Sequence, residues 1–325
     1  MLNWAEPKYI DLPDLRMAYW EAGERTHRPS IILCHGFPEI AYSWRQIIPQ
    51  LAQSGFHVIA PDQRGYGYTG NPLSDRGGPE DVALYDMAHL CGDLDSLVSA
   101  LNIDKAVFVG HDWGGIVTWQ LPFLRPNRVA GLIGVNTPFI PRLTMDPIKA
   151  FREALGDDMY IVAFQDYGLA ETKLGKDVAR SLRVFYRKSD LVSPREGPWV
   201  NFALLKILDL DESTWSGNPI LSDNDLEIYA NAFKRNGFRG PINWYRNFTR
   251  NWENSADFSQ SIDIPSLMIC AENDPFLPPS MAQPMSKYVH DLETHLISDC
   301  GHWTQNEKPA ELTHLLIDWL SRRFV

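Results

Sequence analysis

The hydrophobic residues of this chain form short continuous runs, and segments with helical periodicity separate these runs. Four runs fall in the first part of the chain and two lie near its end. Continuous apolar strands that alternate with helices are typical of a parallel sheet covered on both faces. We therefore expect strands within six segments: 30–36, 56–62, 105–112, 129–136, 264–274 and 294–302.

The remaining core elements also follow from the pattern. Residues 8–23 form two short alternating stretches around Pro13 and Asp14, which predicts a hairpin. Helices are expected over 44–51 and 86–102. Near the end of the chain, residues 310–324 place their leucines and Trp319 on one helical face.

The alternation of strands and helices stops after Asn136. Prolines interrupt the chain, and the long segment 151–252 has helical spacing and no convincing strand. Apolar residues recur there every four positions, as in Leu174, Val178 and Leu182, and again in Trp244, Phe248 and Trp252. We predict an α/β core in two segments, 1–139 and 256–325, with an inserted helical cap over 140–255. A cap above the carboxyl edge of a parallel sheet is where a substrate pocket is expected.

Composition and charge exclude several classes of function. The 325 residues are 44% hydrophobic and 22% charged, a mixture typical of a soluble globular protein. The net charge of −11 disfavours binding to nucleic acid or to anionic lipid. No apolar run reaches the roughly 20 residues of a membrane span, and neither a signal peptide nor a peroxisomal signal is visible. We expect a cytoplasmic protein without a membrane partner.

The cysteines indicate neither a metal site nor a disulfide framework. They form no C-x-x-C pair and no Cys/His ligand spacing, so we expect buried reduced thiols and no metal or other cofactor. A monomer is the default expectation. The four cysteines are Cys34, Cys91, Cys270 and Cys300.

The strongest local motif is Gly-His-Asp-Trp-Gly-Gly at 110–115, between a predicted strand and a helix. It matches the G-x-S-x-G nucleophile elbow, with Asp112 in place of the serine. A helix N-cap is the alternative role for an aspartate there. A carboxylate with an ordinary pKa of about 3.9 is ionised at pH 7 and can displace a leaving group from an sp³ carbon. Asp112 is therefore the predicted nucleophile, and its product is an alkyl ester.

Hydrolysis of that ester requires a base and a group that orients the base. Among the nine histidines, only His302 follows the last predicted strand with a glycine before it. Asp274, after the penultimate strand, is the expected orienting acid, and Glu272 is the second choice. The chain order is then nucleophile, acid, histidine, as in α/β hydrolases.

A second donor loop is expected after the first buried strand, at His35-Gly36-Phe37-Pro38. The backbone N–H groups of Phe37 and Trp113 would face the oxyanion that forms when the ester is attacked. The glycine-rich segment 62–70 lacks the arrangement of a nucleotide-binding loop, so we interpret it as core structure.

Together these motifs resemble those of soluble epoxide hydrolases in the α/β-hydrolase-fold superfamily. The resemblance covers nearly the whole chain through HGFPE, DQRGYGYT, GHDWGG, NWYRN, ENDPF and GHWTQNE. It implies an α/β-hydrolase core with a mostly parallel sheet and an inserted helical cap. The family uses two cap tyrosines to hold the epoxide oxygen. Tyr245 in NWYRN matches one of them, and Tyr160 matches the other through its Y-x-x-x-F-Q spacing, with Tyr167 as a nearby alternative.

The resemblance also implies the reaction. It is the hydrolysis of epoxides to vicinal diols through a covalent ester on Asp112, with water and a small hydrophobic epoxide as partners and no cofactor. Glu39 of HGFPE is a candidate for positioning the water. Aromatic residues of the cap favour an apolar substrate. They are Phe151, Phe164, Phe185, Trp199, Phe202 and Trp215.

Three other functions fit parts of this pattern. A dehalogenase shares the fold and the Asp nucleophile, but it needs side-chain N–H donors for the halide, of which Trp113 offers one. An esterase is disfavoured because Asp112 replaces serine. A non-catalytic receptor on the same fold need not keep a complete nucleophile, acid and base.

Overall fold

The computed structural model describes residues 3–4, 6–188 and 202–325. The chain forms two compact units. The core unit comprises Met1–Gln63, Ala88–Pro141 and Ser259–Val325, and the cap unit comprises Arg64–Met87 and Arg142–Phe258. The cap unit thus includes residues 64–87, which the sequence analysis placed in the first core segment.

An eight-stranded sheet forms the centre of the core unit, in the order β1-β2-β4-β3-β5-β6-β7-β8. β1 pairs antiparallel with β2, and β2 with β4, whereas every other neighbouring pair is parallel. This confirms the N-terminal hairpin and the mostly parallel sheet. The strands are β1 Lys8–Asp11, β2 Arg16–Ala22, β3 Ser30–Cys34, β4 Val58–Pro61, β5 Ala106–His111, β6 Val129–Val135, β7 Ser266–Ala271 and β8 Leu292–Ile297.

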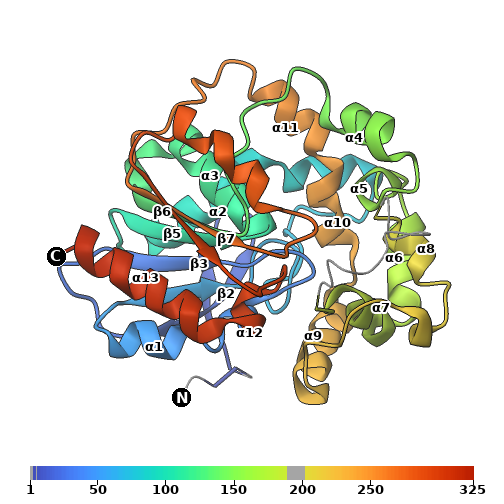
Figure 1. The fold of residues 1–325 in the computed structure, drawn as a ribbon, viewed down its shortest axis with the longest axis horizontal. Helices are drawn as coiled ribbons and strands as arrows, with labels where there is room; N and C mark the ends of the chain where they lie inside the picture. The colour runs from blue at the N-terminus through green and yellow to red at the C-terminus, as the bar shows by residue number, and fades with distance from the viewer. Residues whose placement is uncertain (1–2, 5, 189–201) are drawn as a thin grey trace. The chain divides into compact units, whose positions relative to one another are not determined.

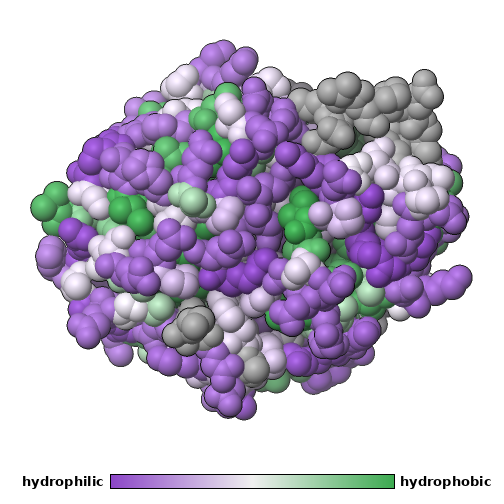
Figure 2. Space-filling view, turned by 60° about the horizontal axis from the view of Figure 1, so that its bottom comes forward, coloured by the Kyte–Doolittle hydropathy of each residue, from purple (hydrophilic) through white to green (hydrophobic). Residues whose placement is uncertain are grey.

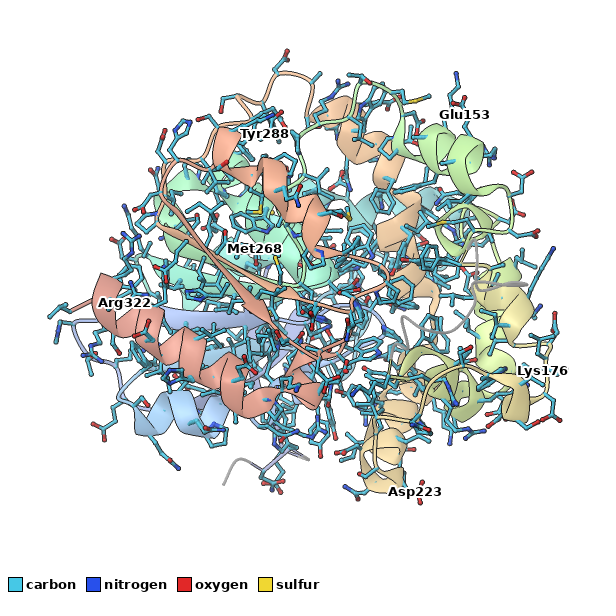
Figure 3. The ribbon with its side chains drawn as sticks, in the orientation of Figure 1. Glu153, Lys176, Asp223, Met268, Tyr288 and Arg322 are labelled. Carbon is cyan, nitrogen blue, oxygen red and sulfur yellow. The ribbon has the colours of Figure 1, made fainter. Side chains whose placement is uncertain are left out.

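The inner strands are buried because helices cover both faces of the sheet. Every residue of β3, β5 and β7 is buried, as expected for continuous apolar runs. α3 packs against β3, β5 and β6, whereas α1 packs against α13, and Figure 1 shows the sheet between α3 and α13. Met268 of β7 is fully buried and lies in this centre (Figure 3). The helices are η1 Ala41–Trp44, α1 Ile48–Gln53, α2 Met87–Ala100, α3 Trp113–Leu124, η3 Pro126–Arg128, η6 Pro279–Lys287, α12 Thr304–Glu307 and α13 Pro309–Arg323.

The described part of the cap unit is helical, as its apolar spacing predicted. The every-fourth-residue patterns nevertheless cross helix ends. Leu174 lies on α6 and Leu182 on α7, because the Asp177 side chain accepts the Arg180 N–H and starts a new helix. The elements are η2 Pro79–Tyr85, α4 Pro147–Leu155, α5 Tyr160–Ala163, α6 Leu169–Lys176, α7 Val178–Phe185, α8 Leu204–Ile207, η5 Glu212–Thr214, α9 Asp223–Asn236, α10 Arg239–Arg246 and α11 Phe248–Asn254.

Hydrophilic residues dominate the face drawn in Figure 2, and hydrophobic areas on it are small and separate. None of the helices in the described part of the chain is long and apolar enough to cross a membrane. All four cysteines are free and buried, as expected.

Candidate active site

Asp112 lies at the turn between β5 and α3, where the chain is too crowded for side chains on its neighbours. A Cβ on Gly110 would lie 2.1 Å from the Gly114 carbonyl oxygen, and one on Gly114 would lie 2.1 Å from the Cys34 carbonyl oxygen. Asp112 itself adopts φ 51° and ψ −121°, a conformation that L-residues rarely adopt. The strand therefore turns directly into the helix and presents the Asp112 carboxylate at the carboxyl end of β5.

Two backbone donors already point at this carboxylate. The Phe37 N–H donates to Oδ1 of Asp112 over 2.8 Å, and the Trp113 N–H also donates to the carboxylate. Burial raises the pKa of Asp112, whereas His302, His111 and these two amides oppose the rise. Phe37 and Trp113 are thus placed to stabilise negative charge on an oxygen of Asp112.

His302 lies between the two acids. Its Nδ1 atom is 2.8 Å from Oδ2 of Asp274, and its Nε2 atom is 3.8 Å from Oδ2 of Asp112. Burial alone would lower the pKa of His302, but Asp274, Asp112 and Glu39 outweigh burial and raise it to about 9. The separation from Asp112 exceeds a hydrogen bond, so the imidazole faces the Asp112 carboxylate without being hydrogen-bonded to it.

Asp274 is fully buried and accepts four hydrogen bonds. Beyond His302, its donors are the N–H groups of Phe276 and Leu277 and the side-chain amide of Asn136. Burial would raise its pKa, but these partners lower it, so the residue stays ionised. Glu272, the second choice, is exposed and accepts the Asp299 N–H instead.

Asn136 belongs to this network and was not identified from the sequence. Its Nδ2 lies 2.8 Å from Oδ2 of Asp274, and its Oδ1 accepts the Thr304 hydroxyl at 2.6 Å. Asn136 follows β6 with φ 61°, a conformation that asparagine tolerates better than most residues. A polar residue directly after a buried strand was the available signal.

Glu39 lies beneath the site and not on the surface. It is fully buried, and its Oε2 accepts the Gly36 N–H at 2.6 Å and lies 2.8 Å from Nδ1 of His111. Nε2 of His111 lies 2.7 Å from the carbonyl oxygen of His302. Because that carbonyl can only accept, Nε2 carries a proton, and the pair links the Phe37 loop to the backbone of the base. His111 is the second site residue that the sequence analysis missed.

The two candidate tyrosines of the cap unit lie together. The ring centroids of Tyr160, at the start of α5, and Tyr245, on α10, are 5.8 Å apart, and the rings meet edge to face. The Y-x-x-x-F-Q spacing explains the pair. The Phe164 ring packs 5.1 Å from that of Tyr245, and the Gln165 amide donates to the Tyr245 carbonyl oxygen at 3.1 Å.

Tyr167 does not join this pair. It is 41% exposed, its hydroxyl donates to the Gly77 carbonyl oxygen at 2.7 Å, and the Arg246 guanidinium lies over its ring. The structure therefore separates Tyr160 from the nearby alternative.

A polar cluster fixes α10, the helix that carries Tyr245. Arg239 lies 2.6 Å from Oδ2 of Asp75, and the Tyr85 hydroxyl donates to the same carboxylate at 2.5 Å. Nearby, Gly65 and Gly240 approach so closely that a Cβ on Gly240 would lie 2.8 Å from the Gly65 Cα. Residues 64–70 of the glycine-rich segment thus pack beside α10 within the cap unit.

Several cap aromatics serve packing. Phe151 meets Phe248 edge to face, and Trp215 is buried beneath the guanidinium of Arg180. Trp199 lies outside the described residues. Across the described parts of both units, no three His, Cys, Asp or Glu side chains are grouped to hold a metal ion.

Comparison with known proteins agrees with this architecture. The family model described as alpha/beta hydrolase fold matches residues 29–309. Epoxide hydrolase A of Mycobacterium tuberculosis is 37% identical, over 97% of both chains. Bifunctional epoxide hydrolase 2 of Sus scrofa is 38% identical over 95% of this chain, which spans only 54% of that relative's length. The crystal structure of Epoxide Hydrolase A from Mycobacterium thermoresistibile has a TM-score of 0.86 and 35% identity, and the match covers 98% of this chain and 99% of that one. The chain belongs to the α/β-hydrolase-fold family, and its similarity to epoxide hydrolases is confirmed.

Proposed function

We propose that this protein hydrolyses epoxides to vicinal diols through a covalent ester on Asp112. The observation that carries the proposal is the environment of Asp112. A carboxylate occupies the elbow, the Phe37 N–H contacts one of its oxygens, and Nε2 of His302 faces the other. The similarity to epoxide hydrolases over nearly the full chain supports the substrate class.

The first step is attack by Oδ2 of Asp112 on one carbon of the epoxide ring. The C–O bond of the ring breaks, and the oxygen leaves as an alkoxide that needs a proton. A phenol, with an ordinary pKa of about 10, can hydrogen-bond this oxygen and then donate that proton. In the proposal Tyr160 and Tyr245 supply the two phenols. Their adjacent rings and the Phe164 ring form an aromatic cluster that suits a hydrophobic epoxide.

The second step is hydrolysis of the ester. His302 takes a proton from water, and the resulting hydroxide attacks Cγ of Asp112. Negative charge then develops on Oδ1, the oxygen that the Phe37 N–H already contacts. A donor of this kind contributes about 2.7–4 kcal/mol to the transition state. The tetrahedral intermediate expels the product oxygen, which takes the proton from His302. The second proton of the water leaves the Asp112 carboxyl group and returns to the phenolate formed in the first step, so that both the carboxylate and the phenol are restored.

Charge changes during the cycle favour this role of His302. In the free enzyme the Asp112 carboxylate helps to keep the pKa of His302 near 9. Ester formation removes that negative charge, so the pKa of His302 falls when a base is needed. Asp274, which remains ionised, holds the ring through Nδ1 and stabilises the imidazolium that forms.

Isotope transfer tests the covalent route. In ¹⁸O-water with enzyme in excess over a hydrophobic epoxide such as styrene oxide, the diol of the first turnover should carry no label. The label should instead appear in the peptide that contains Asp112. Label in the first-turnover diol would show direct attack by water and would overturn the ester mechanism.

Substitution of the tyrosines tests the reaction class. Diol formation should be lost in the Tyr160→Phe/Tyr245→Phe double variant and retained in Tyr167→Phe, a matched control in the same unit. Halide release from a bromoalkane is measured alongside. Halide release without diol formation would keep Asp112 as the nucleophile but identify a dehalogenase. The two tyrosines would then have only a packing role.

A further inference from the structure

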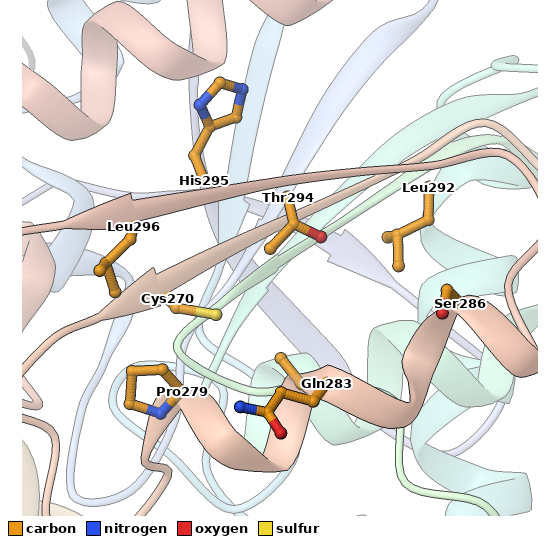
Figure 4. A pocket seen from close by; sticks show the side chains of 9 residues that line it. Cys270, Pro279, Gln283, Ser286, Leu292, Thr294, His295 and Leu296 are labelled. Atoms are coloured by element: carbon orange, nitrogen blue, oxygen red, sulfur yellow. The ribbon is translucent and has the colours of Figure 1, made fainter.

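Strand β8 forms one edge of the core sheet, and a pocket lies beside it. In the described part of the chain, β7 is the only strand that pairs with β8. The pocket measures about 440 Å³ and is lined by residues of β8, by Cys270 of β7 and by η6. Figure 4 shows Leu292, Thr294 and Leu296 on the side of β8 that faces η6, and His295 on the opposite side.

The backbone groups of β8 alternate between β7 and the open edge. The carbonyl oxygens of Asp291 and Ile297 accept the N–H groups of Ser266 and Glu272 on the β7 side, at 2.8 and 3.0 Å. Because alternate residues of a parallel strand bond to the same neighbour, the odd-numbered residues between them also face β7. The N–H and C=O groups of Leu292, Thr294 and Leu296 therefore face the open edge.

This edge lacks three of the features that can block further pairing. Edge strands are commonly protected by lysine, proline or a bulge. β8 has the sequence Leu-Glu-Thr-His-Leu-Ile, which contains neither lysine nor proline, and its register with β7 is continuous. Leu296 is 51% exposed. An extended, regular edge with an exposed leucine is a template for another strand.

We propose that β8 of a second copy of this chain pairs antiparallel with β8, on a two-fold axis at Thr294. Hydrogen-bonded pairs across an antiparallel ladder join residues whose backbone groups both face the junction. This places Leu292 opposite Leu296 of the second copy and Thr294 opposite its own equivalent. All edge-facing groups of these three residues are then hydrogen-bonded.

Charge selects this register. With the axis at Thr294, Glu293 of one copy lies opposite His295 of the other, in a non-hydrogen-bonded pair whose side chains are close. An axis at Glu293 would oppose two carboxylates, and one at His295 would oppose two imidazoles, arrangements that are unfavourable when charged. Within one chain, Oε1 of Glu293 already lies 2.7 Å from Nε2 of His295 and 2.7 Å from the Arg322 guanidinium. Pairing thus continues an existing charge cluster.

The face of β8 that carries the leucines also matches the same face of a second copy. Leu292 and Leu296 flank Thr294 on the pocket side, so the two-fold axis brings each against the other leucine of the second copy. Residues 292–296 are Leu-Glu-Thr-His-Leu. When this segment pairs antiparallel with a copy of itself, leucine lies opposite leucine and glutamate lies opposite histidine. That symmetry favours a second copy over an unrelated strand.

Sedimentation velocity of the full chain over a range of concentrations tests the proposal. We expect a dimer whose dissociation constant rises at least tenfold in Leu296→Lys, because the lysine leaves a charge at the junction. Leu73→Lys is the matched control, since Leu73 is 68% exposed and belongs to the cap unit. Unchanged thermal unfolding shows that the variants are folded. A monomeric wild type, or a dimer that Leu296→Lys leaves intact, would overturn the proposal.

Cysteine trapping tests the register separately. Opposed Cα atoms in a hydrogen-bonded antiparallel pair lie about 5.5 Å apart, within the range that a disulfide spans. Thr294→Cys should therefore form a disulfide-linked dimer under mild oxidation, whereas Glu293→Cys and His295→Cys should not. The native cysteines are all buried, so the wild type should remain uncrosslinked. Crosslinking through Glu293→Cys or His295→Cys and not through Thr294→Cys would overturn the assigned axis.

Discussion

Asp112 and His302 face each other at 3.8 Å between Oδ2 and Nε2, a distance too long for a hydrogen bond. The Asp112 carboxylate is instead held by backbone N–H groups, and the His302 ring contacts Asp274. Each side chain therefore has its own hydrogen-bond partners, and under the proposed mechanism the carboxylate oxygen that faces His302 is the one that attacks the epoxide.

The pH dependence of stability and of kcat should reveal the raised pKa of His302. Its folded pKa of about 9 lies above the ordinary value of about 6.5. Protonated His302 thus stabilises the folded state fully below about pH 6.5, and this contribution is lost as pH rises through about 9. In Asp274→Asn we expect the acidic limb of the kcat profile for ester hydrolysis to move to lower pH and kcat to fall by about 10⁴-fold. An unchanged limb would show that Asp274 does not set the pKa of the base.

Asn136 should act by positioning Asp274. Asn136→Ala removes one of the four donors to this buried carboxylate. We expect kcat to fall by about 10- to 150-fold, which corresponds to the typical strength of a hydrogen bond to a charged group. Asn102→Ala is the matched control, because Asn102 also has a positive φ (55°) but is exposed. If both variants lose activity equally, the effect comes from the backbone conformation and not from the amide.

Glu39 should contribute to the stability of the fold. Burial would raise its pKa, but His111, the Gly36 N–H and His35 lower it, so it remains a buried carboxylate. In Glu39→Gln the charge is lost while an acceptor for the Gly36 N–H remains. A hydrogen bond to a charged group typically contributes about 1.5–3 kcal/mol, and urea unfolding measures the loss of this contribution. Unfolding at the wild-type midpoint would show that the charge of Glu39 does not stabilise the fold.

Asp75 should stabilise the cap unit at neutral pH. Burial would raise the pKa of Asp75, but Arg239, Tyr85 and the Gly77 N–H lower it below its ordinary 3.8. This contribution is present above pH 3.8 and is lost as pH falls through the folded pKa. Asp75→Asn should lower the melting temperature at pH 7, and the difference from wild type should shrink in acid. A difference that is constant with pH would argue against the charge of Asp75.

Much of this arrangement could be predicted from the sequence because local chemistry determines it. Continuous apolar runs identified the buried strands, and the glycines around Asp112 identified the elbow. His302 and Asp274 were found because each follows a strand at the same edge of the sheet. Their geometry with Asp112 is as expected, and their catalytic roles remain proposals.

The residues that were missed act through distant contacts. His111 bonds to Glu39 and to the carbonyl oxygen of His302, which are far away in the chain. Asn136 donates to Asp274, and the inserted cap separates these two residues in the sequence. Neither contact has a periodic signature, and the position of Asn136 directly after a buried strand gave a local signal for the residue but none for its partner. The breaks in the cap helices were also missed, because side-chain capping at Asp177 ends a pattern that hydrophobic spacing alone continues.

The insertion of the cap between β6 and β7 fixes the order in which the site is completed during synthesis. Strands β1–β6 leave the ribosome with Asp112 and the Phe37 loop, but Asp274 and His302 follow residues 142–258. At typical rates of translation this delay is about ten seconds. For that time the outer edge of β6 has no neighbouring strand, and Asp112 lacks both Asp274 and His302. Under the proposed mechanism, a chain arrested within the cap would carry a carboxylate open to alkylation without the residues that hydrolyse the ester.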